Sequence, residues 1–112
     1  MNPIYDLTSL VYMAHTAATD KGFWDEEHPN LGEKIALIHS ELSEALEEVR
    51  AGHAPDEVYE VNGKPEGLPI ELADAVIRIA DLCGYYGIDL NAAVHRKLNY
   101  NRHRPTKHGK QF

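Results

Sequence analysis

The sequence is poor in cysteine, since Cys83 is the only one among its 112 residues. A lone cysteine excludes an internal disulfide and a zinc site built from cysteines, as is common for proteins of a reducing compartment. We interpret Cys83 as a small apolar side chain of the core.

The sequence also lacks long hydrophobic runs. No stretch approaches the roughly 18 consecutive apolar residues that a membrane-spanning helix needs. A secretory signal would place basic residues ahead of its apolar ones. The first ten residues, MNPIYDLTSL, contain no basic residue. We therefore expect a cytoplasmic protein that is neither secreted nor embedded in a membrane.

Positive charge is scarce over most of the chain. Residues 1–90 hold all 18 acidic residues but only five of the 11 basic ones, whereas residues 91–112 hold six basic residues and no acid. An acidic body repels nucleic acid and attracts cations, while a basic end attracts phosphate. This pattern argues against nucleic acid as the main ligand and favours a metal-chelated polyphosphate.

The spacing of apolar residues predicts an all-α fold in one domain, 1–112. Because so small a domain buries a modest core, we expect it to associate as a dimer or tetramer. Four helices joined by short connections predict a four-helix-bundle type of fold. We expect the first helix to start at Asn2-Pro3 and to span about 3–19, and the others to span 31–52, 69–86 and Asp89 to Pro105. A polar insert occupies 53–66 and a basic tail 102–112.

The polar insert contains one weak strand signal. Val58 to Val61 followed by Asn62-Gly63 indicates a small hairpin or a turn. Pro65 argues against a second strand, because proline cannot donate a hydrogen bond to a sheet.

Acidic residues lie beside the apolar face of the second predicted helix. Glu41, Glu44 and Glu48 share one stripe, because residues three or four apart lie on the same side of a helix. Taken alone, such a Glu-x-x-Glu pattern usually marks a solvated face.

The third predicted helix is apolar around most of its circumference, so we expect it to be almost fully buried. Its polar residues, Glu71, Asp74, Arg78 and Asp81, fall on one stripe. Arg78 can neutralise one acid of that stripe, but a buried carboxylate without a partner costs several kcal/mol. Two facing acidic stripes with so few bases predict a bound cation, and carboxylate oxygens suit Mg2+ or Mn2+.

The two acidic pairs also resemble a known signature. Glu41-x-x-Glu44 and Glu71-x-x-Asp74, separated by 26 residues, are similar to the motif of the MazG-like nucleotide pyrophosphohydrolases. The runs at 22–25, 32–38, 97–102 and 108–110 resemble compact members of the same family, so the resemblance covers nearly the whole chain.

The resemblance implies an all-α NTP pyrophosphohydrolase fold, assembled as a dimer or a pair of dimers. It implies Mg2+ held by Glu41, Glu44, Glu71 and Asp74, and hydrolysis of a nucleoside triphosphate to the monophosphate and pyrophosphate. The family often carries a further glutamate where this chain has Ser40. The number of metal ions and the general base, one of the glutamates or Glu48, therefore stay open.

Candidate substrate-binding residues lie outside the acidic pairs. The fourth predicted helix places Lys97, Asn101 and Arg104 on one face, where they can contact phosphate, although basic residues also favour a helix C-terminus. Lys34, one turn before the acidic stripe, is another phosphate candidate. Trp24 either stacks on a base or fills the core between the first and second predicted helices.

Two other functions compete with this prediction. A related pyrophosphohydrolase would act on phosphoribosyl-ATP with the same scaffold. A non-enzymatic helical oligomer would instead bind nucleic acid or a protein partner through its basic tail.

Overall fold

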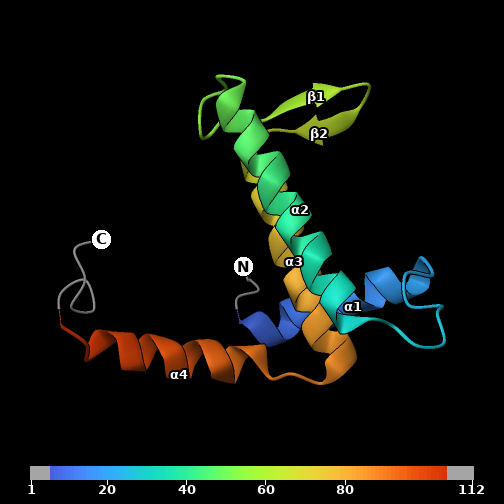
Figure 1. Ribbon diagram of the computed structural model, residues 1–112, viewed down its shortest axis with the longest axis vertical. Helices are drawn as coiled ribbons and strands as arrows, with labels where there is room; N and C mark the ends of the chain where they lie inside the picture. The colour runs from blue at the N-terminus through green and yellow to red at the C-terminus, as the bar shows by residue number, and fades with distance from the viewer. Residues whose placement is uncertain (1–5, 106–112) are drawn as a thin grey trace.

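The computed structural model describes residues 6–105, and it confirms the all-α class. The described residues form four helices and one short two-stranded hairpin (Figure 1). None of the described helices combines the length and the apolar composition that crossing a membrane requires. The elements in chain order are α1 (Leu7–Asp20), α2 (Leu31–Arg50), β1 (Tyr59–Val61), β2 (Lys64–Glu66), α3 (Leu68–Tyr86) and α4 (Leu90–Arg102).

Polar caps fix where most of the helices begin. Asn30 accepts a hydrogen bond from the backbone N–H of Glu33 and Asp89 from that of Ala92, so α2 and α4 begin as predicted. Helix α3 ends before Gly87, whose left-handed φ of 67° suits glycine.

The predicted start of the first helix was wrong. Helix α1 begins at Leu7, because the side chain of Asp6 accepts a hydrogen bond from the backbone N–H of Ser9 and caps the first turn. Asn2 and Pro3, the predicted cap and first turn, lie outside the described residues.

The hairpin alternative for the polar insert is confirmed. Strands β1 and β2 pair antiparallel, with Tyr59 opposite Glu66 and Val61 opposite Lys64. Asn62 and Gly63 both adopt positive φ, as a tight two-residue hairpin turn requires. Pro65 is tolerated because a two-stranded sheet consists only of edge strands.

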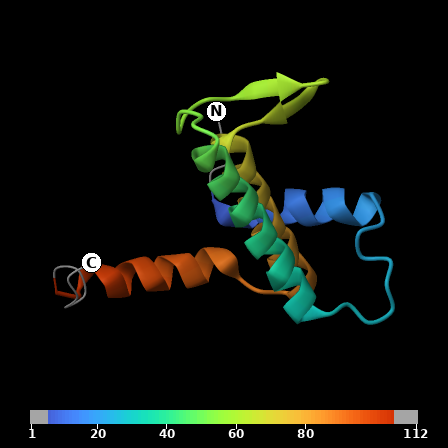
Figure 2. The ribbon, with the colours of Figure 1, turned by 45° about the horizontal axis from the view of Figure 1, so that its top comes forward.

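The four helices do not close into a bundle within one chain, which corrects the predicted architecture. Helices α2 and α3 pack along each other, and α1 crosses against α3 (Figures 1 and 2). Helix α4 runs away from the α2–α3 pair and contributes no buried residue. It is tied to the start of α1, where the backbone N–H of Leu7 donates to Oδ1 of Asn91 at 3.4 Å.

Helix α3 is also less buried than its sequence predicts. Ala75, Ala80, Leu82 and Cys83 form its share of the core, which confirms the buried cysteine. One side of α3 meets α2 and another meets α1, but no described element covers the remaining side. The apolar side chains left exposed along α2 and α3 include Leu42, Leu46, Val49, Leu72, Val76 and Ile79.

A glycine in α3 allows α1 to approach closely. A Cβ atom at Gly84 would lie 2.5 Å from Cβ of His15 on α1, nearer than such atoms come. The crossing of α1 and α3 therefore depends on the missing side chain.

We expect Gly84→Ala to destabilise the chain by about 1–3 kcal/mol through this clash. Helix propensity alone would make the same change stabilising by roughly 1 kcal/mol. Ala73→Gly, at an exposed position of α3, gives the contribution of helix propensity alone. Urea unfolding measures the free energy of unfolding of both variants. An increase in the free energy of unfolding for Gly84→Ala would contradict the close packing of α1 on α3.

Candidate metal centre

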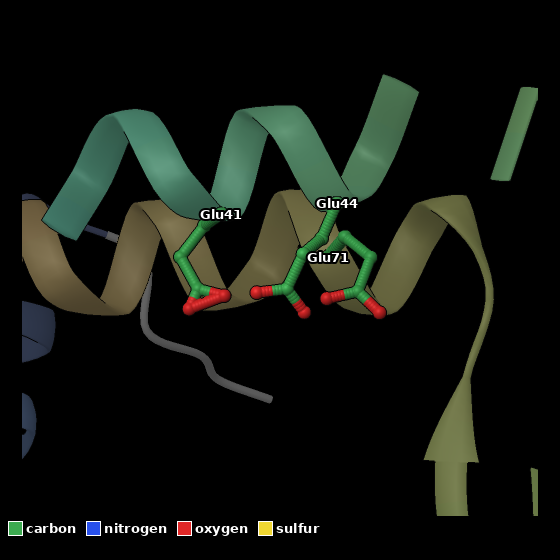
Figure 3. A group of neighbouring side chains, drawn as sticks. All are labelled: Glu41, Glu44 and Glu71. Carbon is green, nitrogen blue, oxygen red and sulfur yellow. The ribbon is translucent and has the colours of Figure 1, made fainter. Parts of the chain in front are cut away.

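Three glutamates from two helices meet at one point. Glu41 and Glu44 extend from α2 and Glu71 from α3, and one carboxylate oxygen of each lies within 4.8 Å of the others. Figure 3 shows the three carboxylates side by side on the same side of the α2–α3 pair. The structure thus joins two sequence segments, as the acidic stripes predict.

Helix geometry places two of these acids at the packed α2–α3 contact. Glu41 and Glu71 are only 7% and 5% exposed, while Glu44 lies at the exposed rim. Glu71 stands in the first turn of α3, where the unpaired N–H groups of a helix favour negative charge. Burial at this contact removes most of the water that would otherwise solvate the two carboxylates.

Only one of the three acids has a basic partner. Nε of Arg78 donates to Oε2 of Glu41 at 3.0 Å, across from α3 to α2. We expected Arg78 to neutralise an acid of its own stripe, and that was wrong, because its side chain reaches the neighbouring helix instead. Among the described residues, no side chain donates a hydrogen bond to the carboxylate of Glu71 or forms an ion pair with it.

The missing partner changes the chemistry of Glu71. The pKa of Glu71 is raised from 4.5 to about 7, mainly by burial and in addition by the charges of Glu44, Asp74, Glu66 and Glu41. A carboxyl group in this setting either keeps a proton or gains a cation.

The spacing of the oxygens is slightly wider than a small divalent cation would require. Oxygens bound to Mg2+ at about 2.1 Å are at most about 4.2 Å apart, so modest rotations of the three side chains suffice. Three carboxylates supply the hard, all-oxygen ligand set that Mg2+ and Mn2+ prefer. Glu41, Glu44 and Glu71 are therefore the residues that would hold the ion.

Asp74 stands apart from this group. It lies one turn after Glu71 on α3, and its carboxylate is not among the oxygens that converge. Burial raises its pKa, as does the neighbouring Glu41, while Arg78 opposes the rise. Asp74 and Glu41 instead border a cavity between α1 and α3.

The structure adds an acid that the sequence analysis missed. Glu66, at the end of β2, forms a second group with Glu48 and Glu71, again within 4.8 Å. The hydroxyl of Tyr59 donates to both oxygens of Glu48, at 2.8 and 3.1 Å. Glu66 shares no helix with the other acids, so only the hairpin register could have indicated it.

Trp24 is packed within the chain. Its ring stacks on Tyr85 at 3.9 Å and 6°, and its indole N–H donates to Oδ1 of Asp81 at 2.8 Å. The ammonium of Lys34 lies 4.6 Å from the Trp24 ring and pairs with Glu26 at 2.9 Å. Trp24 thus packs on α3 and not between the first two helices, and neither Trp24 nor Lys34 joins the glutamates. Base stacking by Trp24 stays a prediction.

The predicted face of the fourth helix is only partly formed, because α4 ends at Arg102 and Arg104 lies beyond it. Helix α4 carries Lys97 and Asn101 away from the α2–α3 pair (Figure 2). Lys97 and Arg104 approach the ring of Tyr100, at 5.0 and 5.3 Å. Oδ1 of Asn101 is buried without a hydrogen-bond partner. Phosphate binding by these residues stays a prediction.

Comparisons with protein-family models, with curated proteins and with solved structures return no match. What the fold and the site show is an all-α chain with a cluster of three carboxylates from two helices. Any narrower identity rests on the motif Glu41-x-x-Glu44 and Glu71-x-x-Asp74.

The raised pKa of Glu71 predicts how stability depends on pH without metal. The folded chain binds this proton more tightly than the unfolded chain, so the free energy of unfolding falls as the pH rises from about 4.5 to about 7. We expect Glu71→Gln to reduce that fall and to be the more stable protein at pH 8. Urea unfolding in the presence of a chelator measures this.

Glu47→Gln is the matched control, because Glu47 is exposed on α2 and outside the cluster. It should retain the pH dependence of the unchanged protein. A Glu71→Gln variant with the full pH-dependent fall would show that Glu71 is not the group responsible.

Proposed function

We propose that the chain binds Mg2+ or Mn2+ at Glu41, Glu44 and Glu71 and hydrolyses a nucleoside triphosphate to the monophosphate and pyrophosphate. The observation that carries this proposal is Glu71, a 5% exposed carboxylate with no hydrogen-bond or ion-pair partner in residues 6–105, which lies beside the acids of a second helix. The MazG-like motif supports the choice of nucleotide, since it contains the same residues.

A bound divalent cation would neutralise phosphate oxygens and lower the pKa of a water molecule. Water then adds to phosphorus, the anhydride bond between the α- and β-phosphates breaks, and pyrophosphate leaves. The proton of the water passes to a carboxylate. Glu48 is our candidate for this role, because Tyr59 fixes its orientation beside Glu66 and Glu71.

Two side chains near the glutamates, Arg78 and Asp74, also have roles in this proposal. Arg78 donates to Glu41 but is 44% exposed, so its guanidinium is accessible to a phosphate oxygen as well. Asp74, one turn from Glu71 on α3, completes the predicted set of four acids.

Self-association belongs to the same proposal. Leu42, Leu46 and Val49 on α2 repeat the spacing of Leu72, Val76 and Ile79 on α3, so each helix exposes an apolar stripe. A second copy would cover these stripes in a dimer, or in a tetramer built from two dimers. The extended α4 of that copy would then be available to bring Lys97, Asn101 and Arg104 near the acids.

The decisive variant is Glu71→Gln combined with Asp74→Asn. We expect it to lose Mg2+ binding in calorimetry and to release pyrophosphate at least about a hundredfold more slowly, because the ion's charge stabilises the transition state. A panel of ribo- and deoxynucleoside triphosphates and phosphoribosyl-ATP identifies the substrate, with products separated by anion-exchange chromatography.

Glu47→Gln again serves as the control, and it should keep both Mg2+ binding and turnover. Unchanged pyrophosphate release in the double variant would contradict the proposal. Absence of Mg2+ binding and of turnover in the unchanged protein would favour the alternative of a non-enzymatic oligomer.

A further inference from the structure

A cavity of about 340 Å³ opens directly beside the acids. Ala14, Ala17 and Ala18 of α1 line one side of it, and Glu41 and Asp74 stand at its border. Its volume is at the small end of the range for ligand sites, so it suits one ring system and not a whole nucleoside triphosphate. The position next to Glu41 would leave the phosphates of such a ligand beside the glutamates.

The walls of this cavity suit a flat group. The three alanines present only methyl groups, which leave a shallow surface against which a ring can lie. Phe23, from the loop after α1, also lines the cavity and is 65% exposed. A large aromatic side chain left open at the edge of a cavity is an effective stacking partner for a planar ring.

One polar side chain in the cavity has an unused acceptor. Oδ1 of Asp81 accepts two hydrogen bonds, from Nε1 of Trp24 at 2.8 Å and from Nδ1 of His15 at 2.9 Å. These two bonds fix the carboxylate, and its side chain is only 17% exposed. Its other oxygen, Oδ2, has no hydrogen-bond partner among the described residues, although Asp81 lines the cavity.

An ionised carboxylate only accepts hydrogen bonds. A ligand ring that meets Oδ2 must therefore present an N–H group, and the amino group of cytosine is a common partner of aspartate in base recognition. The same position in uracil is a carbonyl oxygen, which the carboxylate repels. The N3–H of uracil is a poorer partner, because carbonyl oxygens flank it on both sides.

We propose that this cavity binds the base of the nucleotide and that Asp81 selects a base with an amino group in place of the corresponding keto group, cytosine over uracil and adenine over hypoxanthine. The inference rests on the proposed function for the identity of the ligand. It adds a specificity-determining residue that lies outside the acidic motif.

The first experiment measures base selection without metal or phosphate. Deoxycytidine and deoxyuridine, and adenosine and inosine, are titrated into the full chain in the presence of a chelator, and binding is followed by NMR chemical shifts. We expect the amino-bearing nucleoside of each pair to bind at least about tenfold more tightly, because one hydrogen bond to a charged group separates them.

The variant Asp81→Asn tests the residue itself. Its side-chain oxygen can still accept from Trp24 and His15, while an amide N–H2 takes the place of Oδ2. We expect the preference for the amino-bearing nucleoside to be lost or reversed. The unfolding transition of the variant shows whether the fold is retained, and Asp81→Ser, whose side chain carries no charge, replaces it if it is not; loss of the preference is expected there too, and an unchanged preference would overturn the role of Asp81.

The cavity is tested by filling it. Ala17→Leu should weaken nucleoside binding at least about tenfold, because the larger side chain occupies the place of the ring. Thr16→Leu is the matched control, since Thr16 is exposed on the same helix and does not line the cavity. It should leave nucleoside binding unchanged.

The outcomes separate this inference from the proposed function. Turnover of nucleoside triphosphates with equal binding of both members of each pair would overturn the cavity proposal alone. Selective nucleoside binding without any turnover would support the cavity and contradict the hydrolase. Binding that is unaffected by Ala17→Leu would place the base elsewhere and overturn the proposal.

Discussion

Uncompensated negative charge between α2 and α3 is the constraint on which the site depends. Two glutamates, Glu41 and Glu71, are buried at this contact, and only Glu41 has a basic partner, Arg78. A buried carboxylate without a partner destabilises the fold unless a proton or a cation neutralises it. The buried charge thus lowers the stability of the metal-free chain, and a divalent cation bound at the same place would raise it.

The rest of the molecule supports this contact. The hairpin adds Glu66 and holds Glu48 through Tyr59, so five acids belong to one connected region with Asp74 close by. Helix α1 crosses α3 on the other side, where the absence of a side chain at Gly84 allows it to approach. That crossing creates the cavity beside Glu41 and orients Asp81 through His15.

Local patterns predicted the helices well, because helical spacing and caps such as Asn30 and Asp89 act within a few residues. Of the two predicted acidic pairs, three members converge and Asp74 does not. Long-range consequences were harder to predict. Arg78 was assigned to an acid on its own helix, and the partner across the helix contact depends on how α2 and α3 are rotated. Glu66 reaches the cluster through the hairpin, and the burial of α3 was overestimated because a single chain leaves apolar stripes uncovered. These outcomes follow from packing, which spacing along one helix does not specify.

The most direct test of the central claim is the binding of Mn2+ to the full chain, followed by electron paramagnetic resonance at neutral pH. We predict saturable binding of at least one ion per chain, competition by Mg2+, and loss of that binding in Glu71→Gln. A chain that binds no Mn2+, or that binds it equally well after Glu71→Gln, would contradict the claim that the buried charge of the α2–α3 contact serves to hold a cation.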